Sequence, residues 1–233
     1  MKTLWLFLGF GMLTGCATSH SSSHSALLEA FAQEAMPPAE KQASMKPSAQ
    51  KARKKVVETA QASLGKKQIV LQGKKYPNDC SGFVNALYAQ VGIDLMQTAQ
   101  PKDNAVTAMF RYAQVHGKIF KGGWPVPGDL VFFRNTYRLK TQRSSAALTH
   151  VGIVESMDAD GTVYVIHRVQ RGVVRYAMNL NEKKQTKNQH GKRINDYIRA
   201  RQGSQPAKLT AELFVSYASL LPVESALIAR NEK

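Results

Sequence analysis

The stretch Asp79-Cys80-Ser81-Gly82-Phe83-Val84 carries one of the two cysteines of the chain at the expected start of a helix. Asp79 can cap that helix, and apolar residues recur behind it at helical spacing. A thiol in the first turn meets unpaired backbone N–H groups and the positive end of the helix dipole, and both favour the thiolate. The position therefore predicts a nucleophile at Cys80. The alternative is a small buried thiol that packs as a hydrophobic residue.

The other cysteine, Cys16, follows a segment typical of exported proteins. The chain opens with Met1-Lys2, is apolar over residues 4–13 and then reads Leu13-Thr14-Gly15-Cys16. The apolar run is too short to span a bilayer and is typical of a secretory signal. The last four residues resemble the lipobox of bacterial lipoproteins, which implies that Cys16 becomes the lipidated first residue of the mature chain. An ordinary signal peptide with an incidental cysteine is the alternative.

This resemblance also implies a place in the bacterial cell envelope. Ala17 after the lipidated cysteine is typical of outer-membrane lipoproteins that face the periplasm. Disulfides are permitted in that compartment, but acylation of Cys16 would leave Cys80 without a partner in the chain. Because a lone thiol there is open to oxidation, its presence favours a chemical role for Cys80.

Composition predicts a globular domain with an anionic partner. The chain has 233 residues, 43% of them hydrophobic, and a formal net charge of +16. A basic exported protein suggests peptidoglycan carboxylates, anionic lipid headgroups or wall polymers as partners. Nucleic acid is the other usual partner of basic proteins, but the export signal and the lack of a nucleic-acid motif argue against it. A lysine-rich surface that serves only solubility is the alternative.

The order of the expected elements indicates an α+β fold. Helices are expected over residues 48–64 and from Cys80 to about Gly92. The strands that follow are expected at 129–133, 150–156, 162–169 and 173–178, with a turn at 158–161. Helices first and an antiparallel sheet afterwards are typical of this class.

The expected organisation has four parts. Residues 1–15 form the signal, 16–47 the lipidated cysteine and its tether, 48–203 the principal domain, and 204–233 a C-terminal helix and tail. The helix in the last part is expected over residues 209–221, because leucines and a tyrosine recur there at helical spacing before Pro222.

Two of the six histidines lie on neighbouring predicted strands. His150 begins one strand and His167 lies near the middle of the next, so a turn around residues 159–160 brings them nearly opposite one another. Two adjacent imidazoles would let His167 orient His150 through its second ring nitrogen. A metal site is an alternative use, but further ligands at convincing spacing are lacking. A purely structural strand histidine is the other alternative for His167.

Together these residues resemble the NlpC-type cell-wall peptidases, which are papain-like bacterial cysteine peptidases. Four segments match in the family's order: Asp79-Cys80-Ser81-Gly82-Phe83-Val84, Pro127-Gly128-Asp129-Leu130-Val131-Phe132-Phe133, His150-Val151-Gly152-Ile153-Val154 and Val165-Ile166-His167. The resemblance implies a papain-like fold, with the nucleophile at a helix start packed on an antiparallel, barrel-like sheet. Asp129 in the second segment is expected to cap a turn.

The resemblance also implies a chemistry. Cys80 would be the nucleophile, His150 the general base and His167 the polar third member. The oxyanion would meet the backbone N–H of Cys80. The substrate would be a peptidoglycan stem peptide, often cut between D-glutamate and a diamino acid, and no cofactor or metal is implied.

The sequence departs from the family pattern near the second oxyanion donor. The family's Tyr-x-x-Gly-Gly stretch is absent, and Gln72 or Tyr76 would have to substitute. A long basic connection after the second segment is expected to meet substrate carboxylates, or else to be a solvated insertion. The expected substrate contacts are Ser81, Arg134, Arg138 and Arg143. Two alternatives stay open: a related amidase or acyltransferase on another wall or lipid substrate, and a non-catalytic peptidoglycan-binding module.

Overall fold

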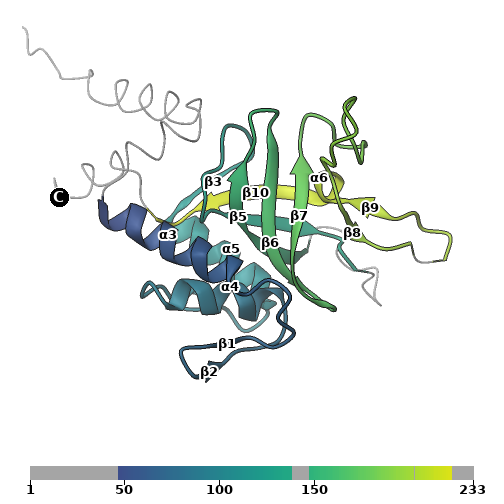
Figure 1. Ribbon diagram of the computed structural model, residues 1–233. Coiled ribbons are helices and arrows are strands. Elements are labelled where there is room, and N and C mark those ends of the chain that lie inside the picture. The colour runs from purple at the N-terminus through teal and green to yellow at the C-terminus, as the bar shows by residue number, and fades with distance from the viewer. Residues whose placement is uncertain (1–46, 138–146, 202, 222–233) are drawn as a thin grey trace, which may run out of the picture.

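The computed structural model describes residues 47–137, 147–201 and 203–221, and within them the fold is α+β. Three helices lie together against one side of a bent, six-stranded antiparallel sheet (Figure 1). These three helices are α3 (Pro47–Gln61), α4 (Cys80–Ala89) and α5 (Ala105–His116). The strands of the sheet, in spatial order, are β3 (Lys118–Phe120), β10 (Phe214–Ser219), β4 (Leu130–Arg134), β5 (Leu148–Met157), β6 (Thr162–Val169) and β7 (Gly172–Asn179). A short fourth helix, α6 (Thr210–Leu213), comes directly before β10.

Two small hairpins flank the sheet. Strands β1 (Val70–Leu71) and β2 (Lys74–Lys75) pair just ahead of α4, and β8 (Tyr197–Arg199) pairs with β9 (Lys208–Leu209) beyond β7. In the described part of the chain the large sheet is open, with β3 and β7 at its edges. The barrel-like sheet that the resemblance implied is therefore a bent sheet without a closing pair.

The expected elements ahead of residue 180 are confirmed, with ends shifted by one to three residues. Helix α3 begins at Pro47, a residue suited to the first helical position because it has no N–H to leave unpaired. Strands β5 and β6 are joined by the expected turn, in which the Gly161 N–H donates to the Asp158 carbonyl at 2.9 Å. Both strands are rich in Val and Ile and are bounded by turn residues, which is why the sequence pattern predicted them.

The expected helix over residues 209–221 is wrong. Only Thr210–Leu213 is helical, and Phe214–Ser219 forms β10, which lies between β3 and β4. The expected boundary between residues 203 and 204 therefore cuts the sheet in two. Because β10 is covered on both faces, its apolar residues do not alternate with polar ones, and their spacing matched a helix by coincidence.

Two apolar clusters hold the layers together. The first fills the space between the helices and the sheet, with Phe83, Leu87 and Tyr88 of α4 against Phe132 and Ile153. The second covers the opposite face of the sheet; it includes Val131, Phe133, Val154, Val165, Met178, Ala211 and Tyr217. Helix α4 is thus fixed on the sheet by buried side chains along one face, and its first residue lies at one end of that contact.

A buried ion pair joins α3 to the sheet. Arg53 donates to Asp129 at 2.7 Å, and both side chains are almost completely buried. Arg53 also donates to the Ser219 hydroxyl and the Leu221 carbonyl, both at 2.6 Å. Asp129 accepts the N–H of Val126 at 2.9 Å, which is the turn-capping role expected of it. One arginine therefore holds α3, the start of β4 and the end of β10 together.

No helix in the described ranges is long and apolar enough to cross a membrane. The signal, Cys16 and the tether lie outside those ranges, as do Arg138 and Arg143 of the basic connection.

Candidate active site

Cys80 is the first residue of α4, and its neighbours fix the helix start. The Asp79 carboxylate accepts the N–H of Gly82 at 2.8 Å and the Ser81 hydroxyl at 2.7 Å, so the predicted cap is confirmed. Gly82 is required there because a Cβ would lie 1.9 Å from the Pro77 carbonyl oxygen. The chain ahead of the helix thus folds closely over its first turn.

Arg168 ties the segment before Cys80 to strand β6. This side chain is buried, and it donates to the Asn78 side-chain oxygen at 3.2 Å and to the Lys67 carbonyl at 3.0 Å. Arg168 follows His167 directly in β6. The same end of this strand therefore carries a predicted site histidine and an arginine whose hydrogen bonds fix the segment that leads to Cys80.

The two predicted histidines are in contact. His150 Nε2 and His167 Nδ1 are 2.6 Å apart, and the rings meet edge to face with centroids 4.9 Å apart. The β5–β6 register pairs Ile153 with Ile166, which places His167 across from Gly152, two residues from His150. The expected proximity within one or two residues is therefore confirmed.

Gly152 makes room for this contact. A Cβ at this position would lie 2.6 Å from Val165 Cγ1 and 3.1 Å from the His167 Cβ. The missing side chain lets the His167 ring lie diagonally across the strand pair, beside His150.

Three backbone N–H groups surround the Cys80 thiol. Those of Val151, Ser81 and Cys80 itself each act to lower the pKa of the thiol. Val151 is the residue next to His150, so the thiol lies beside the strand that carries the histidine pair. Cys80 keeps part of its surface exposed, so the sulfur is not sealed within the core.

Burial dominates the protonation of the site. Burial raises the pKa of Cys80 to about 11. The backbone N–H groups act to lower this pKa, and the negative charge of Asp79 adds a smaller rise. Burial likewise lowers the pKa of His150 to about 4, with an opposing contribution from Asp79. The expectation that the helix start favours the thiolate is therefore wrong for the resting protein, in which the Cys80 thiol and the His150 imidazole are both neutral.

His167 is the most enclosed member of the group. Burial, helped by the nearby His150 and Arg171, holds its pKa well below the usual range. Its Nε2 is buried without a hydrogen-bond partner among the described residues. The ring of Tyr176, on β7, meets the His167 ring at a centroid distance of 4.5 Å.

The other predicted site residues are spread around Cys80. Gln72 is exposed at the turn between β1 and β2, where its φ is +52°, and Tyr76 is half-buried against the helix-side cluster. Ser81 is buried and its hydroxyl is engaged with Asp79. Arg134 is exposed at the end of β4. The histidine pair is thus brought together as predicted, whereas the oxyanion and substrate residues stay predictions.

Sequence reasoning missed Tyr176, Arg168 and the role of Gly152. Tyr176 could have been found from the β6–β7 hairpin, because the register that pairs His167 with Val174 puts Tyr176 on the same face. Arg168 gives no such signal, since its partners lie 90 and 101 residues away. Among the described residues no group of three or more His, Cys, Asp or Glu side chains is arranged to hold a metal ion.

Comparison with known families agrees with this geometry. Residues 71–168, which include Cys80, His150 and His167, match the model of the CHAP domain. Over this range the chain is similar to the CHAP domain. This is a papain-like cysteine peptidase or amidase domain found in NlpC/P60-like cell-wall hydrolases, so the predicted family resemblance is confirmed at that level. The CHAP domain indicates a cell-wall hydrolase of the peptidase or amidase kind. A comparison with curated proteins gave no match.

Proposed function

We propose that the protein is a lipid-anchored cysteine peptidase that hydrolyses peptidoglycan stem peptides with Cys80, His150 and His167. The observation that carries the proposal is the 2.6 Å contact between His150 Nε2 and His167 Nδ1, together with a partly exposed cysteine at a helix start whose thiol meets the N–H of Val151, the residue after His150. A nucleophile, a base and a group that orients the base are what acyl transfer to a thiol requires.

The mechanism starts from neutral partners. With the pKa of Cys80 raised and that of His150 lowered, the thiol gives its proton to His150 as sulfur attacks the peptide carbonyl. The new C–S bond makes a tetrahedral oxyanion, which the Cys80 N–H and a second donor stabilise. The His150 imidazolium then protonates the leaving amine, and water hydrolyses the thioester. Gln72 and Tyr76 are the candidates for the second donor.

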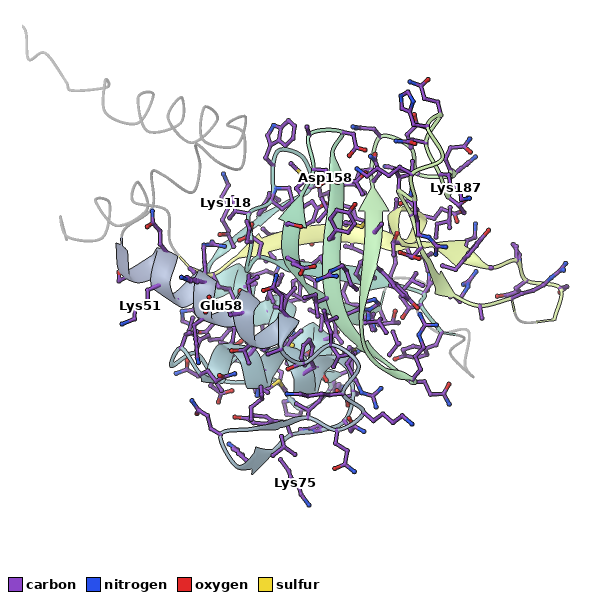
Figure 2. All side chains as sticks on the ribbon, viewed as in Figure 1. Lys51, Glu58, Lys75, Lys118, Asp158 and Lys187 are labelled. Carbon is purple, nitrogen blue, oxygen red and sulfur yellow. The ribbon has the colours of Figure 1, made fainter. Side chains whose placement is uncertain are left out.

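Surface charge supports an anionic substrate. Lys66, Lys67, Lys74 and Lys75 are exposed on the segment that leads to Cys80, and Figure 2 shows Lys75 projecting from the outer end of the β1–β2 hairpin. A stem peptide carries free carboxylates, and a basic rim would raise its local concentration. Arg134, exposed at the end of β4, and Arg138 and Arg143 are proposed as further contacts for substrate carboxylates.

The contribution of the basic rim to substrate binding is tested by reversing charge on the β1–β2 hairpin and, as a control, on α3. Lys74→Glu with Lys75→Glu should raise KM for muropeptides while kcat changes little, and the effect should shrink at high salt. Lys51→Glu is the control, because Lys51 is equally exposed on α3, away from the hairpin (Figure 2). Equal KM values for the hairpin variant and the control would remove the rim from the proposal.

The two cysteines allow one experiment to test both the anchor and the chemistry. The full chain, Cys80→Ala and Cys16→Ala are each expressed, fractionated and incubated with intact sacculi, and released fragments are identified by mass spectrometry. We expect Cys80→Ala to stay with the membrane and release nothing, and Cys16→Ala to become soluble and still cut. The outer membrane, with the domain facing the periplasm, is the expected fraction for the full chain.

The fragments separate the candidate reactions. A new amine and carboxyl within the stem peptide, between D-glutamate and the diamino acid, supports the endopeptidase. Release of whole stem peptides from the glycan would instead assign an amidase. Identical fragments from wild type and Cys80→Ala would refute catalysis by Cys80.

A further inference from the structure

The His167 Nε2 atom has no use in the mechanism above and no polar partner. It is enclosed, since His167 is 1% exposed, and it is one of the few buried polar side-chain atoms left without a hydrogen bond in the described part of the chain. Leaving such an atom unpaired is costly, so its surroundings call for an explanation.

Tyr176 on β7 is an aromatic residue in contact with the His167 ring. Its ring is T-shaped to His167, with an interplanar angle of 69° and a centroid distance of 4.5 Å. Beyond it, Arg171 donates to the Tyr176 hydroxyl at 3.0 Å and lies 5.7 Å from the ring centroid. The face of an aromatic ring is electron-rich, so it attracts an N–H and repels a nitrogen lone pair.

Only one arrangement of protons gives His150 the role of a base toward Cys80. The 2.6 Å contact between the rings holds a single proton, carried either by His150 Nε2 or by His167 Nδ1. If His167 Nδ1 carries it, neutral His150 has its own proton on Nδ1 and cannot accept another there. If His150 Nε2 carries it, His150 Nδ1 keeps a free lone pair.

We propose that Tyr176 is a positioning residue that sets the tautomers of the histidine pair by accepting the His167 Nε2–H on its ring face. With that proton on Nε2, His167 Nδ1 can only accept, so it receives the His150 Nε2–H. The His150 Nδ1 lone pair is then the base available to the thiol. The inference rests on the proposed function only for its kinetic consequence; the tautomers belong to the resting protein.

The groups that surround the pair do not offer another explanation. Asp79 at the start of α4 acts on His150, and Arg171 and His150 act on His167. Arg171 carries only donors and cannot accept the His167 proton. Tyr176 is therefore the group suited to fix it.

The test reads the tautomers directly. The full chain, labelled with ¹⁵N-histidine, is studied at neutral pH by long-range ¹H–¹⁵N correlation, which distinguishes an Nε2–H from an Nδ1–H imidazole. We expect Nε2–H for both His150 and His167. A wild-type His167 that carries its proton on Nδ1 would overturn the inference.

Two variants separate the effect of the Tyr176 ring on the tautomers from the effect of its hydroxyl. Tyr176→Phe keeps the ring face and loses only the Arg171 contact, so both tautomers and kcat should stay as in the wild type. Tyr176→Leu keeps apolar volume without a ring, so His167 should populate the Nδ1–H form and kcat should fall roughly two- to tenfold at unchanged KM. A wild-type tautomer in the Leu variant, or a changed one in the Phe variant, would overturn the inference.

The variant design also covers two difficulties. If the Leu variant does not fold, the wild-type and Phe spectra still decide whether His167 carries its proton on Nε2. If the spectra are as expected but sacculi are not cut, the proposed function fails and the inference about Tyr176 stands.

Discussion

The segment matched by the CHAP model and the segments that flank it contribute different things to the molecule. Residues 71–168 contain Cys80, His150 and His167, which form the candidate site. The flanks contribute α3, β7 and β10, which cover or extend the sheet, together with the Arg53 ion pair and the Tyr176 ring. The matched segment therefore carries the candidate site, and the flanks hold it in place.

This division predicts that substitutions in the two regions differ in what they damage. A change at the start of α4 should affect activity beyond its effect on folding. A change in the α3–β4–β10 contact should affect stability while the folded molecules stay active.

The largest effect on activity is expected from Gly82→Ala. The added Cβ would lie 1.9 Å from the Pro77 carbonyl oxygen, so the segment over Cys80 or the helix start must move. A displacement of about 1 Å at a reacting group costs roughly 100-fold in rate. We expect at least that loss in kcat/KM on muropeptides. The matched control is Gly122→Ala, because a Cβ at Gly122 meets nothing within 4 Å; equal activity of the two variants would contradict the argument.

The largest effect on stability is expected from Arg53→Met. Removing the guanidinium leaves the Asp129 carboxylate buried without its charge partner, which costs about 3–5 kcal/mol. Urea unfolding measures this loss, and kcat of the folded variant at low temperature should be unchanged. Lys54→Met on the same helix is the control, because its 3.8 Å contact with Glu58 is exposed and contributes less than about 1 kcal/mol. A loss of activity without a loss of stability in Arg53→Met would contradict the division between the regions.

The same division explains which features the sequence could predict. The helix start at Cys80, the strands β4 to β7 and the facing histidines follow from local patterns: a cap, short segments rich in Val, Ile and Phe between turn residues, and a short turn. Strand β10 could not be read in this way, because it is defined by its pairing with β3 and β4, about 80 to 100 residues away along the chain. The expected helix at 209–221 was wrong for that reason.

The candidate site shows the same limit. The helix start at Cys80 and the proximity of His150 and His167 were predictable, but the protonation of these three side chains was not. Burial, which raises the pKa of Cys80 and lowers that of His150, depends on how α4 packs against the sheet. A helix start favours the thiolate in an exposed setting, whereas here desolvation is the larger effect.

Burial of the histidines should make stability depend on pH. The pKa of His150 is about 4 in the folded protein and about 6.5 in the unfolded chain, so the unfolded chain binds the extra proton first. Stability is therefore full above pH 6.5 and falls as the pH drops toward 4, by about 3 kcal/mol for this histidine. His167 acts in the same direction.

Urea unfolding between pH 7 and pH 4 measures this slope. His150→Gln should flatten it, and His190→Gln should not, because His190 is exposed in the loop after β7. A His150→Gln slope as steep as that of the wild type would contradict the burial argument.

The smallest effect is expected from Asp79→Asn, which isolates charge from geometry at the start of α4. Asparagine is also a good N-cap, so the bond to the Gly82 N–H can persist and stability should change by only a few tenths of a kcal/mol. Loss of the negative charge removes one cause of the raised pKa of Cys80, so that pKa should fall. The same change removes an influence that raises the pKa of His150, so that pKa should fall as well.

Thiol alkylation of Cys80 as a function of pH measures the first shift, and Asp79→Ala is its partner variant. Alanine removes both the charge and the cap, so it should lower the pKa of Cys80 in the same direction and also cost about 1 kcal/mol of stability. If Asn and Ala destabilise equally, the cap is not what Asp79 contributes. If neither variant moves the alkylation profile toward lower pH, the charge of Asp79 does not act on the thiol, and burial together with the surrounding backbone N–H groups accounts for the protonation of Cys80.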